Sequence, residues 1–255
     1  MNRVQINGTR YYVEGEYPDY EIGVSVTEFI DRVYPTPDNL RDWWIDNSRE
    51  HIEAKLQRTS LFGTTMHDLA EDFAQGHDID ISKLSSKMQH YLTSIAYFFH
   101  DRNVKPIFVE RKVFHRATED IPLSFGGTLD LECMMDWNGK RVRALVDYKS
   151  GNIYKKNKWQ LLAYMMARQQ QEHNLEFHLF NFNPNNWRRT PTGKPKHWKI
   201  TQKDLETFRS FCLIYANEFS NLPNTIRQFD SVSLGNEPQF KQLDLATYIK
   251  NQLND

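Results

Sequence analysis

The stretch LVDYKSG, from Leu145 to Gly151, places an acid and a base two positions apart at the end of an apolar run. Two apolar residues lead directly into Asp147, and Lys149 follows two positions later. Residues i and i+2 of a strand point to the same face, so the Asp147 and Lys149 side chains are expected to lie side by side. The ordinary interpretation is an ion pair where a strand leaves the core, because charges at strand ends usually meet water. The neighbouring sequence favours a functional interpretation.

A second carboxylate is predicted at the same place. SFGGTLDLECMMDW is a strand candidate that contains Asp130, and a turn at Asn138-Gly139 joins it to the strand candidate KRVRALVDYKS. Asp130 lies eight residues before Asn138, and Asp147 lies eight residues after Gly139. In an antiparallel pair joined at this turn, Asp130 and Asp147 are therefore expected to be near neighbours across the strands.

The predicted proximity of Asp130 and Asp147 indicates a divalent metal ion. Two carboxylates at that distance repel each other unless a cation lies between them. Hard oxygen ligands favour Mg²⁺ or Mn²⁺. Lys149 would lie near whatever anion the metal binds, and the backbone carbonyl of Tyr148 is a further candidate ligand.

The chain before this strand pair is predicted to be mostly helical after an initial hairpin, VQINGTRYYV, with Asn-Gly as its turn. Thr36 can cap a helix that has Pro37 in its first position. Gly63 followed by Thr64 or Thr65 as N-cap predicts the start of a separate helix. Helices are expected over residues 24–34, 36–56, 64–75 and 81–101.

Strand patterns dominate from residue 105 onward. KPIFVERKVFHR alternates as a strand does, and after the two strands described above come the helix KWQLLAYMMARQQQ and the strand LEFHLFNFN. Another strand is expected in the segment through HWKI. Thr201 and Asp204 resemble a capping box that opens a long helix, and the last thirty residues are predicted to be a polar tail with a short helix. This order indicates an α/β or α+β fold with a mixed central β-sheet flanked by helices.

The composition allows a substantial core. The chain has 255 residues, of which 39% are hydrophobic, and this suits one large domain rather than a disordered chain. The net charge is −1, but residues 138–203 hold fourteen Lys or Arg against three acids, whereas residues 1–50 hold ten acids against five Lys or Arg. Such an asymmetry is typical of a face that binds a polyanion.

Cysteine usage and hydropathy exclude several classes of protein. Cys133 and Cys212 are the only cysteines and lie far apart, so a zinc ribbon, an iron–sulfur cluster and a disulfide scaffold are not expected. The start, MNRVQINGTRYY, lacks the apolar core of a signal peptide. No apolar run approaches the ~18–20 residues of a membrane span. We therefore expect a cytoplasmic protein with no membrane partner.

Short motifs in a fixed order resemble the PD-(D/E)XK nuclease superfamily. A G-x-x-D motif that ends at Asp130 precedes a D-x-K motif at Asp147 and Lys149. Gln160 and Tyr164 follow, spaced i, i+4 on one face of a helix, and resemble the Q-x-x-x-Y motif of the RecB-like branch.

Upstream segments extend the resemblance to that branch. FGTTMHDLAE resembles its G-x-x-x-H segment, with His67 at the position of an additional metal ligand. Glu110 in FVERKVF matches a Glu often found on the strand before the G-x-x-D strand. VSVTEFI is similar to the SVT segment of phage-type and mitochondrial genome-maintenance exonucleases, so the resemblance spans Val24 to Ala167. Two distant cysteines and the lack of a GxxxxGK[ST] motif indicate a stand-alone module without an iron–sulfur cluster.

The resemblance implies a restriction-endonuclease-like core and a role for each motif residue. Asp130 and Asp147 would bind one or two Mg²⁺ or Mn²⁺ ions, with His67 and, as a further candidate, Glu110 completing the ligand set. Lys149 would position or activate the attacking water. Gln160 and Tyr164 would orient the substrate phosphate or the lysine. These seven side chains and the Tyr148 carbonyl are the predicted site.

Other residues are predicted to contact nucleic acid. The candidates for phosphate contacts are Lys155, Lys156, Lys158, Arg188 and Arg189, and those for base stacking are Trp187 and Trp198. The basic stretch RRTPTGKPKHWK can equally be a solvated hairpin tip. His67 can be a surface histidine, Glu110 can pair with a neighbouring Arg or Lys, and Trp43 and Trp44 are interpreted as packing residues.

The sequence thus predicts a metal-dependent DNA nuclease, with an exonuclease of recombination, repair or phage DNA processing as the first interpretation. A structure-specific or nicking endonuclease and an inactive DNA-binding module of the same fold remain alternatives. The expected partners are single- or double-stranded DNA with a free end and a recombination or replication protein, and the sequence leaves the oligomeric state open. The expected organisation is a hairpin and helical region over 1–105 that contributes the metal-ligand helix, a nuclease core over 106–220 and a tail over 221–255, together one compact domain.

Overall fold

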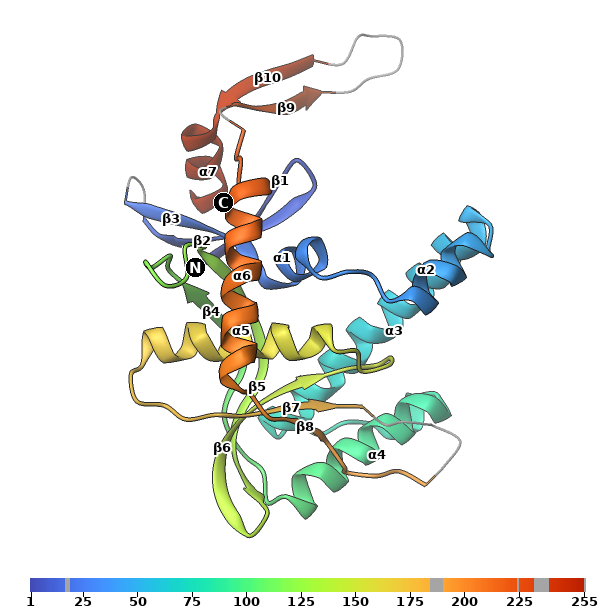
Figure 1. The fold of residues 1–255 in the computed structure, drawn as a ribbon. Coiled ribbons are helices and arrows are strands. Elements are labelled where there is room, and N and C mark those ends of the chain that lie inside the picture. Colours follow the sequence, from blue (N-terminus) through green and yellow to red (C-terminus); the bar gives the residue numbers. More distant parts are fainter. Residues whose placement is uncertain (17–18, 184–189, 224, 232–238, 255) are drawn as a thin grey trace.

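A mixed β-sheet forms the centre of the molecule (Figure 1). The computed structural model describes residues 1–16, 19–183, 190–223, 225–231 and 239–254. Within them, eight strands pair in the order β1-β2-β3-β5-β6-β7-β8, with β4 also pairing with β5. The bounds are β1 Asn2–Ile6, β2 Thr9–Gly15, β3 Tyr20–Ser25, β4 Lys105–His115, β5 Phe125–Trp137, β6 Lys140–Tyr148, β7 His178–Phe182 and β8 Lys196–Trp198. The pairs β3–β5 and β6–β7 are parallel and the others antiparallel, so the predicted mixed sheet is confirmed.

Two Asn-Gly turns fix the strand register. Asn138 and Gly139 have φ values of 50° and 75°, and Asn7 and Gly8 have values of 49° and 81°. A two-residue hairpin turn needs this left-handed backbone at both positions, which Asn and Gly tolerate best. The predicted β1–β2 and β5–β6 hairpins are both present.

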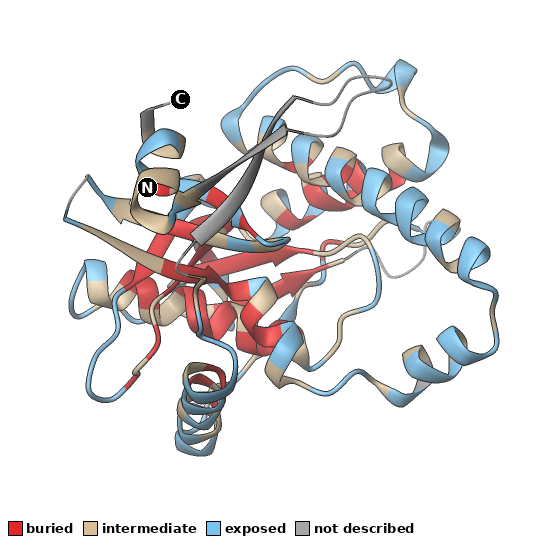
Figure 2. Cartoon of the chain, turned by 90° about the horizontal axis from the view of Figure 1, so that it is seen from above, coloured by how far each residue is buried: buried red, intermediate tan, exposed pale blue. Residues whose placement is uncertain are grey.

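Helices cover both faces of the sheet. On one face lie α1, α5 and α6, whose buried side chains share a cluster that includes Phe125 and Leu145. On the other face lie α3 and α4, whose cluster includes Leu131 and Val146. The bounds are α1 Val26–Val33, α3 Arg49–Gln75, α4 Ser86–Asp101, α5 Lys156–Gln171 and α6 Gln202–Glu218. Figure 2 shows the buried residues gathered on the sheet and on the helix faces turned toward it.

The helices between residues 36 and 75 differ from the prediction. The chain forms α2 (Asp38–Ile45), for which Pro37 rather than Thr36 is the N-cap, and then α3, for which Ser48 accepts a hydrogen bond from the His51 N–H. The predicted single helix over 36–56 is therefore wrong, because Ser48 starts a new helix inside it.

The predicted helix start at Thr64 or Thr65 is also wrong, because α3 continues through Gly63. A glycine inside a helix costs only about 1 kcal/mol relative to alanine. Met66, which α3 buries completely, stabilises the helix by more than that. The predicted helix over 81–101 is shorter than expected, since Ser85 caps α4 after a single 3₁₀ turn, η1, at Ile81–Lys83.

The ends of the chain contain elements that the sequence did not predict. β3 pairs with β5 at Val24 and Phe125, so the N-terminal hairpin belongs to the central sheet. The predicted polar tail contains a second, two-stranded sheet, β9 (Thr225–Ser231) and β10 (Gln239–Asp244), which was not predicted. The short helix predicted in this tail is present as α7 (Leu245–Asn254). Ile249 of α7 packs in one cluster with Val4 of β1. No helix of the described residues is long and apolar enough to cross a membrane.

Candidate active site

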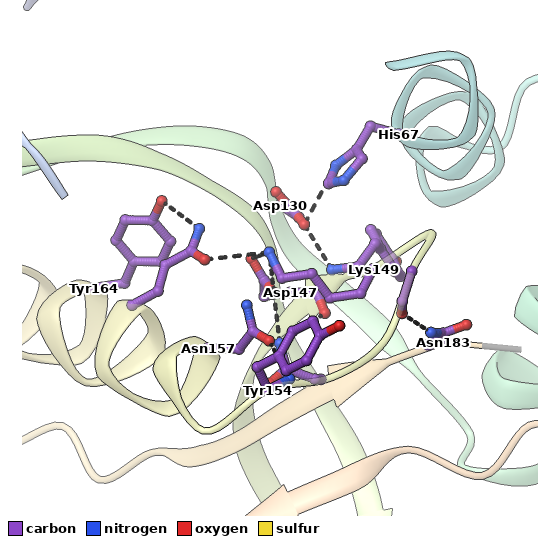
Figure 3. A network of polar contacts seen from close by, with 12 residues as sticks. His67, Asp130, Asp147, Lys149, Tyr154, Asn157, Tyr164 and Asn183 are labelled. Atoms are coloured by element: carbon purple, nitrogen blue, oxygen red, sulfur yellow. Dashed lines mark hydrogen bonds and ion pairs between the residues drawn. The ribbon is translucent and has the colours of Figure 1, made fainter. Parts of the chain in front are cut away.

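Asp130 and Asp147 meet at adjoining positions of β5 and β6 (Figure 3). Leu131 pairs with Val146, and continuing this register by one step sets Asp130 opposite Asp147. The backbone N–H of Tyr148 donates a hydrogen bond of 2.7 Å to Asp130 Oδ2. Both carboxylates are buried, with 7% of Asp130 and 1% of Asp147 exposed. The structure therefore brings the two acids together as the turn spacing predicts.

Lys149 links the acids to α5. Its Nζ lies 2.8 Å from Asp147 Oδ2 and donates to Gln160 Oε1 at 3.2 Å. Gln160 Nε2 in turn donates to the Tyr164 hydroxyl at 3.1 Å. Asp147, Lys149, Gln160 and Tyr164 thus form one chain of polar contacts, which Figure 3 shows running from the strand end to the helix.

Two glycines of the motifs, Gly127 and Gly63, allow close contacts that a larger residue would prevent. A Cβ on Gly127 would lie 2.6 Å from Cε1 of the buried Tyr164 ring, closer than real carbon atoms come. A Cβ on Gly63 would lie 3.3 Å from the Ser150 hydroxyl, which follows the D-x-K motif. Gly127 of the G-x-x-D motif therefore leaves space for the ring of Tyr164. Gly63 allows α3 to lie close to the loop after β6.

His67, Glu110 and Asp130 form a group that can hold a metal ion. Each offers a ligand atom, and these atoms all lie within 4.8 Å of one another. His67 Nδ1 is 3.5 Å from Asp130 Oδ2. The three side chains come from α3, β4 and β5, so no single segment builds the site. Two carboxylates and an imidazole match the ligand preferences of several divalent metals.

Glu110 reaches this group through an unusual backbone. Its φ is +48°, a left-handed value that a glutamate rarely adopts. The flanking pairs, Val109 with Leu131 and Arg111 with Leu129, set it opposite Asp130. Strained backbone of this kind is concentrated at functional sites. The Arg111 guanidinium lies over the Phe108 ring, so Glu110 is grouped with the site rather than with its neighbouring cation.

The electrostatics of the group show a surplus of negative charge. Burial raises the pKa of Glu110 to about 7, and the charge of Asp130 adds to this effect. Burial lowers the pKa of His67, but Asp130 more than reverses that and raises it to about 9. Burial raises the pKa of Asp147 to about 6, although Lys149 opposes the shift. A bound cation would relieve this surplus, so the residues present fit a divalent metal.

Asn181 is a site residue that the sequence analysis missed. Its Nδ2 donates to Asp147 Oδ2 at 2.5 Å, and its Oδ1 accepts from the Trp198 indole N–H at 2.6 Å. Asn181 is fully buried in β7, between Phe180 and Phe182. A polar residue inside an apolar strand was the available signal, because buried polar groups need partners. Trp198 thus helps to fix the position of Asp147 through Asn181. The stacking of a base on Trp198 stays a prediction.

The structure gives several predicted DNA contacts another partner. Lys158 is buried and its Nζ lies 2.5 Å from Asp204, so it joins α5 to α6 instead of facing solvent. Lys156 is half-buried and pairs with Asp31 of α1 at 2.8 Å. Lys155 is exposed at the start of α5. Trp187, Arg188 and Arg189 lie outside the described residues.

A cavity of about 680 Å³ opens beside the polar chain. Its lining includes His67 of α3, Lys149 after β6 and Gln160 of α5. Residues of α1, α2 and α3 line its other walls, including Trp43 and Lys55. A substrate in this cavity would touch His67, Lys149 and these helices together.

Comparison with known proteins agrees with this geometry. The model of one family, the PD-(D/E)XK nuclease superfamily, matches residues 40–232, which include the seven predicted site side chains from His67 to Tyr164 but not the VSVTEFI segment at residues 24–30. Among curated proteins, no match was found. Proteins of the superfamily are nucleases that use divalent metal ions, and the restriction-endonuclease-like fold agrees with the sheet and helices described. By the extent of this match and the residues at the ends of β5 and β6, the chain belongs to the PD-(D/E)XK nuclease superfamily.

Proposed function

We propose that this chain is a divalent-metal-dependent deoxyribonuclease of the RecB-like, phage-type branch, acting as an exonuclease on DNA with a free end in recombination, repair or phage DNA processing. The observation that carries the catalytic part is the unbroken chain of contacts from Asp147 through Lys149 and Gln160 to Tyr164. Burial of Cys133 and Cys212 in separate core clusters supports a site without an iron–sulfur cluster. The branch and the exonuclease mode rest on the motif resemblance.

His67, Glu110 and Asp130, with Asp147 beside them, would hold one or two Mg²⁺ or Mn²⁺ ions, and the Tyr148 carbonyl is a further proposed ligand. When bound, such an ion polarises a phosphodiester oxygen and lowers the pKa of a water molecule. The protein's part is to hold the ligands rigidly. The Tyr148 N–H and Asn181 do so by hydrogen bonds to Asp130 and Asp147, respectively.

Lys149 acts as a cation in this arrangement. Burial lowers its pKa, but Asp147 and Asp130 more than reverse that effect and leave the pKa raised. An ammonium group donates hydrogen bonds, so Lys149 can position the attacking water. We assign it to orienting the water and to offsetting negative charge that builds on the phosphorus oxygens. Gln160, anchored by Tyr164, keeps the ammonium in place for this role.

A cleavage assay on three DNA forms tests the proposal. Purified protein is incubated with end-labelled linear duplex, linear single strand and closed circular DNA, in Mg²⁺, in Mn²⁺ and in EDTA. The proposal predicts loss of linear DNA only, with no loss in EDTA. Cutting of the closed circle would instead establish an endonuclease, and DNA binding with no cleavage in either metal would establish a binding module.

A further inference from the structure

The arm formed by α2 and residues 49–62 of α3 is unlike the rest of the molecule (Figure 1). It projects beyond the sheet, and the first buried residue of α3 is Met66, after the arm has ended. No described side chain of α2 is buried. Large apolar side chains of the arm are exposed instead, among them Trp44, Leu56 and Leu61. An amphipathic helix ordinarily buries one face, so the exposed apolar side chains of the arm leave a surface that a partner could cover.

The inner side of the arm faces the active site. Leu40 and Trp43 of α2 and Lys55 of α3 line the same cavity as His67 and Lys149. Trp43 is half-buried, and Lys55 Nζ lies 4.4 Å from the centre of its ring. An aromatic ring with a neighbouring cation is the pair that single-stranded nucleic acid uses, with the base on the ring and the phosphate at the cation.

A second cavity continues this surface around α3. Its volume is about 470 Å³, and it shares Lys55, Thr59 and Ser150 with the first cavity. Its lining adds Arg58 and Lys87, and Lys87 Nζ lies 3.8 Å from the Phe62 ring centre. The shared residues make the two cavities one path along α3 that ends at Lys149.

The charge of this path differs from that of the whole chain. Its lining holds five Lys or Arg, namely Lys55, Arg58, Lys87, Lys149 and Lys156. Among the described residues that line the two cavities, the single acid is Asp31, and Lys156 already neutralises it. The acids between residues 38 and 62, namely Asp38, Asp42, Asp46, Glu50 and Glu53, line neither cavity. A chain of net charge −1 thus has several cations on a surface that leads to its active site.

We infer that this path binds a single-stranded segment of DNA, with a base stacked on Trp43 and phosphates at Lys55 and Arg58, and delivers the strand to Lys149. A base can stack on a side chain only when its face is free, so the segment must be unpaired. This inference rests on the proposed nuclease function and names the form of its substrate.

The test compares Trp43→Ala with Trp44→Ala, a neighbouring exposed tryptophan that lines neither cavity. Binding of a fluorescent oligothymidylate and of a blunt duplex is measured by anisotropy in EDTA, where cleavage is blocked. Cleavage of the single strand is measured separately in Mg²⁺.

Trp43→Ala should weaken oligothymidylate binding about 5- to 100-fold and raise KM without lowering kcat. Trp44→Ala should change binding less than about two-fold, and Trp43→Phe should retain most of the affinity because it keeps an aromatic face.

Lys55→Ala provides an independent readout. Removing one phosphate contact should reduce the slope of log affinity against log salt by about 0.7 for a single strand. Arg49→Ala is the matched control, since Arg49 pairs with Glu53 on the exposed surface of the same helix and lines neither cavity.

The outcomes separate this inference from the proposed function. Metal- and Lys149-dependent cleavage with unchanged oligothymidylate binding in Trp43→Ala would overturn the inference and leave the nuclease standing. A wild-type protein that neither binds nor cleaves DNA would overturn both. Self-association lost in Trp44→Ala, with DNA binding unchanged in Trp43→Ala, would show that the arm binds protein and would also overturn the inference.

Discussion

The two halves of α3 follow the same helical path but meet different surroundings. Residues 63–75 bury Met66 and Ala70 against the sheet and α4, and there His67 points to Asp130. Residues 49–62 contain no fully buried residue and expose Leu56 and Leu61. The difference separates two requirements of a nuclease. Metal ligands need a position fixed by packing, whereas a surface that receives a flexible strand can remain open until the strand arrives.

The largest effect in the buried half of the site is expected from a substitution of Asp130, the carboxylate that contacts both His67 and the Tyr148 N–H. Asp130→Asn removes a charge that contacts His67, accepts the Tyr148 N–H and belongs to the metal-ligand group. We expect cleavage to fall about 10³-fold or more, measured as kcat in Mg²⁺, because the site loses a hard anionic ligand. Asp136→Asn on the same strand is the control and should cleave normally, since Asp136 lies on the surface with Arg141. Equal activity of the two variants would contradict the assignment.

The contrast within α3 can be measured as stability. Met66→Ala should lower the free energy of unfolding by about 2–5 kcal/mol, because it leaves a cavity in a fully buried cluster. Leu61→Ala, at a position that is 70% exposed, should change it by less than about 0.5 kcal/mol. Urea unfolding followed by circular dichroism gives both values. Similar losses in the two variants would mean that the arm is packed in solution.

A substitution of Gly127 tests whether close packing against Tyr164 is needed for stability and cleavage. In Gly127→Ala the new methyl group would strike the Tyr164 ring, which is buried and cannot swing away. We expect a loss of about 1–3 kcal/mol of stability and, through displacement of Gln160 and Lys149, about 10²-fold slower cleavage. Gly151→Ala is the matched control, because a Cβ there meets nothing within 4 Å. In a Tyr164→Ala background, where the ring is absent, Gly127→Ala should cost little further stability, and an undiminished cost there would show that the clash is not its cause.

The smallest expected effect concerns the support of Asp147. Trp198→Phe removes the N–H that Asn181 accepts, and we expect a cost of about 1–2 kcal/mol in stability with a few-fold lower kcat and an unchanged KM. Trp137→Phe is the control, because it makes the same substitution at another tryptophan. The Trp137 N–H is buried without a hydrogen-bond partner among the described residues, so kcat should not change. A raised KM in Trp198→Phe with normal kcat would indicate a DNA contact instead.

Much of the site follows from local sequence, and its surroundings do not. The Asn138-Gly139 turn and the D-x-K spacing suffice to set Asp130, Asp147 and Lys149 together, because turn type and strand period are local properties. Asn181 and the arm depend on which segments meet in three dimensions, and no short pattern encodes that. The continuation of α3 through Gly63 was missed for the same reason, since packing of Met66 outweighs the local signal of a helix start.

The central claim is that Lys149, held between Asp147 and Gln160, serves cleavage of DNA. The most direct measurement is the single-turnover cleavage rate of end-labelled linear DNA in Mg²⁺ for the wild-type chain, Lys149→Ala and the control Lys140→Ala, with thermal unfolding recorded for each. Lys140 is an exposed lysine at the turn between β5 and β6. The account predicts a rate at least about 10²-fold lower for Lys149→Ala and a near-normal rate for Lys140→Ala. A folded Lys149→Ala protein that cleaves DNA at the wild-type rate would contradict it.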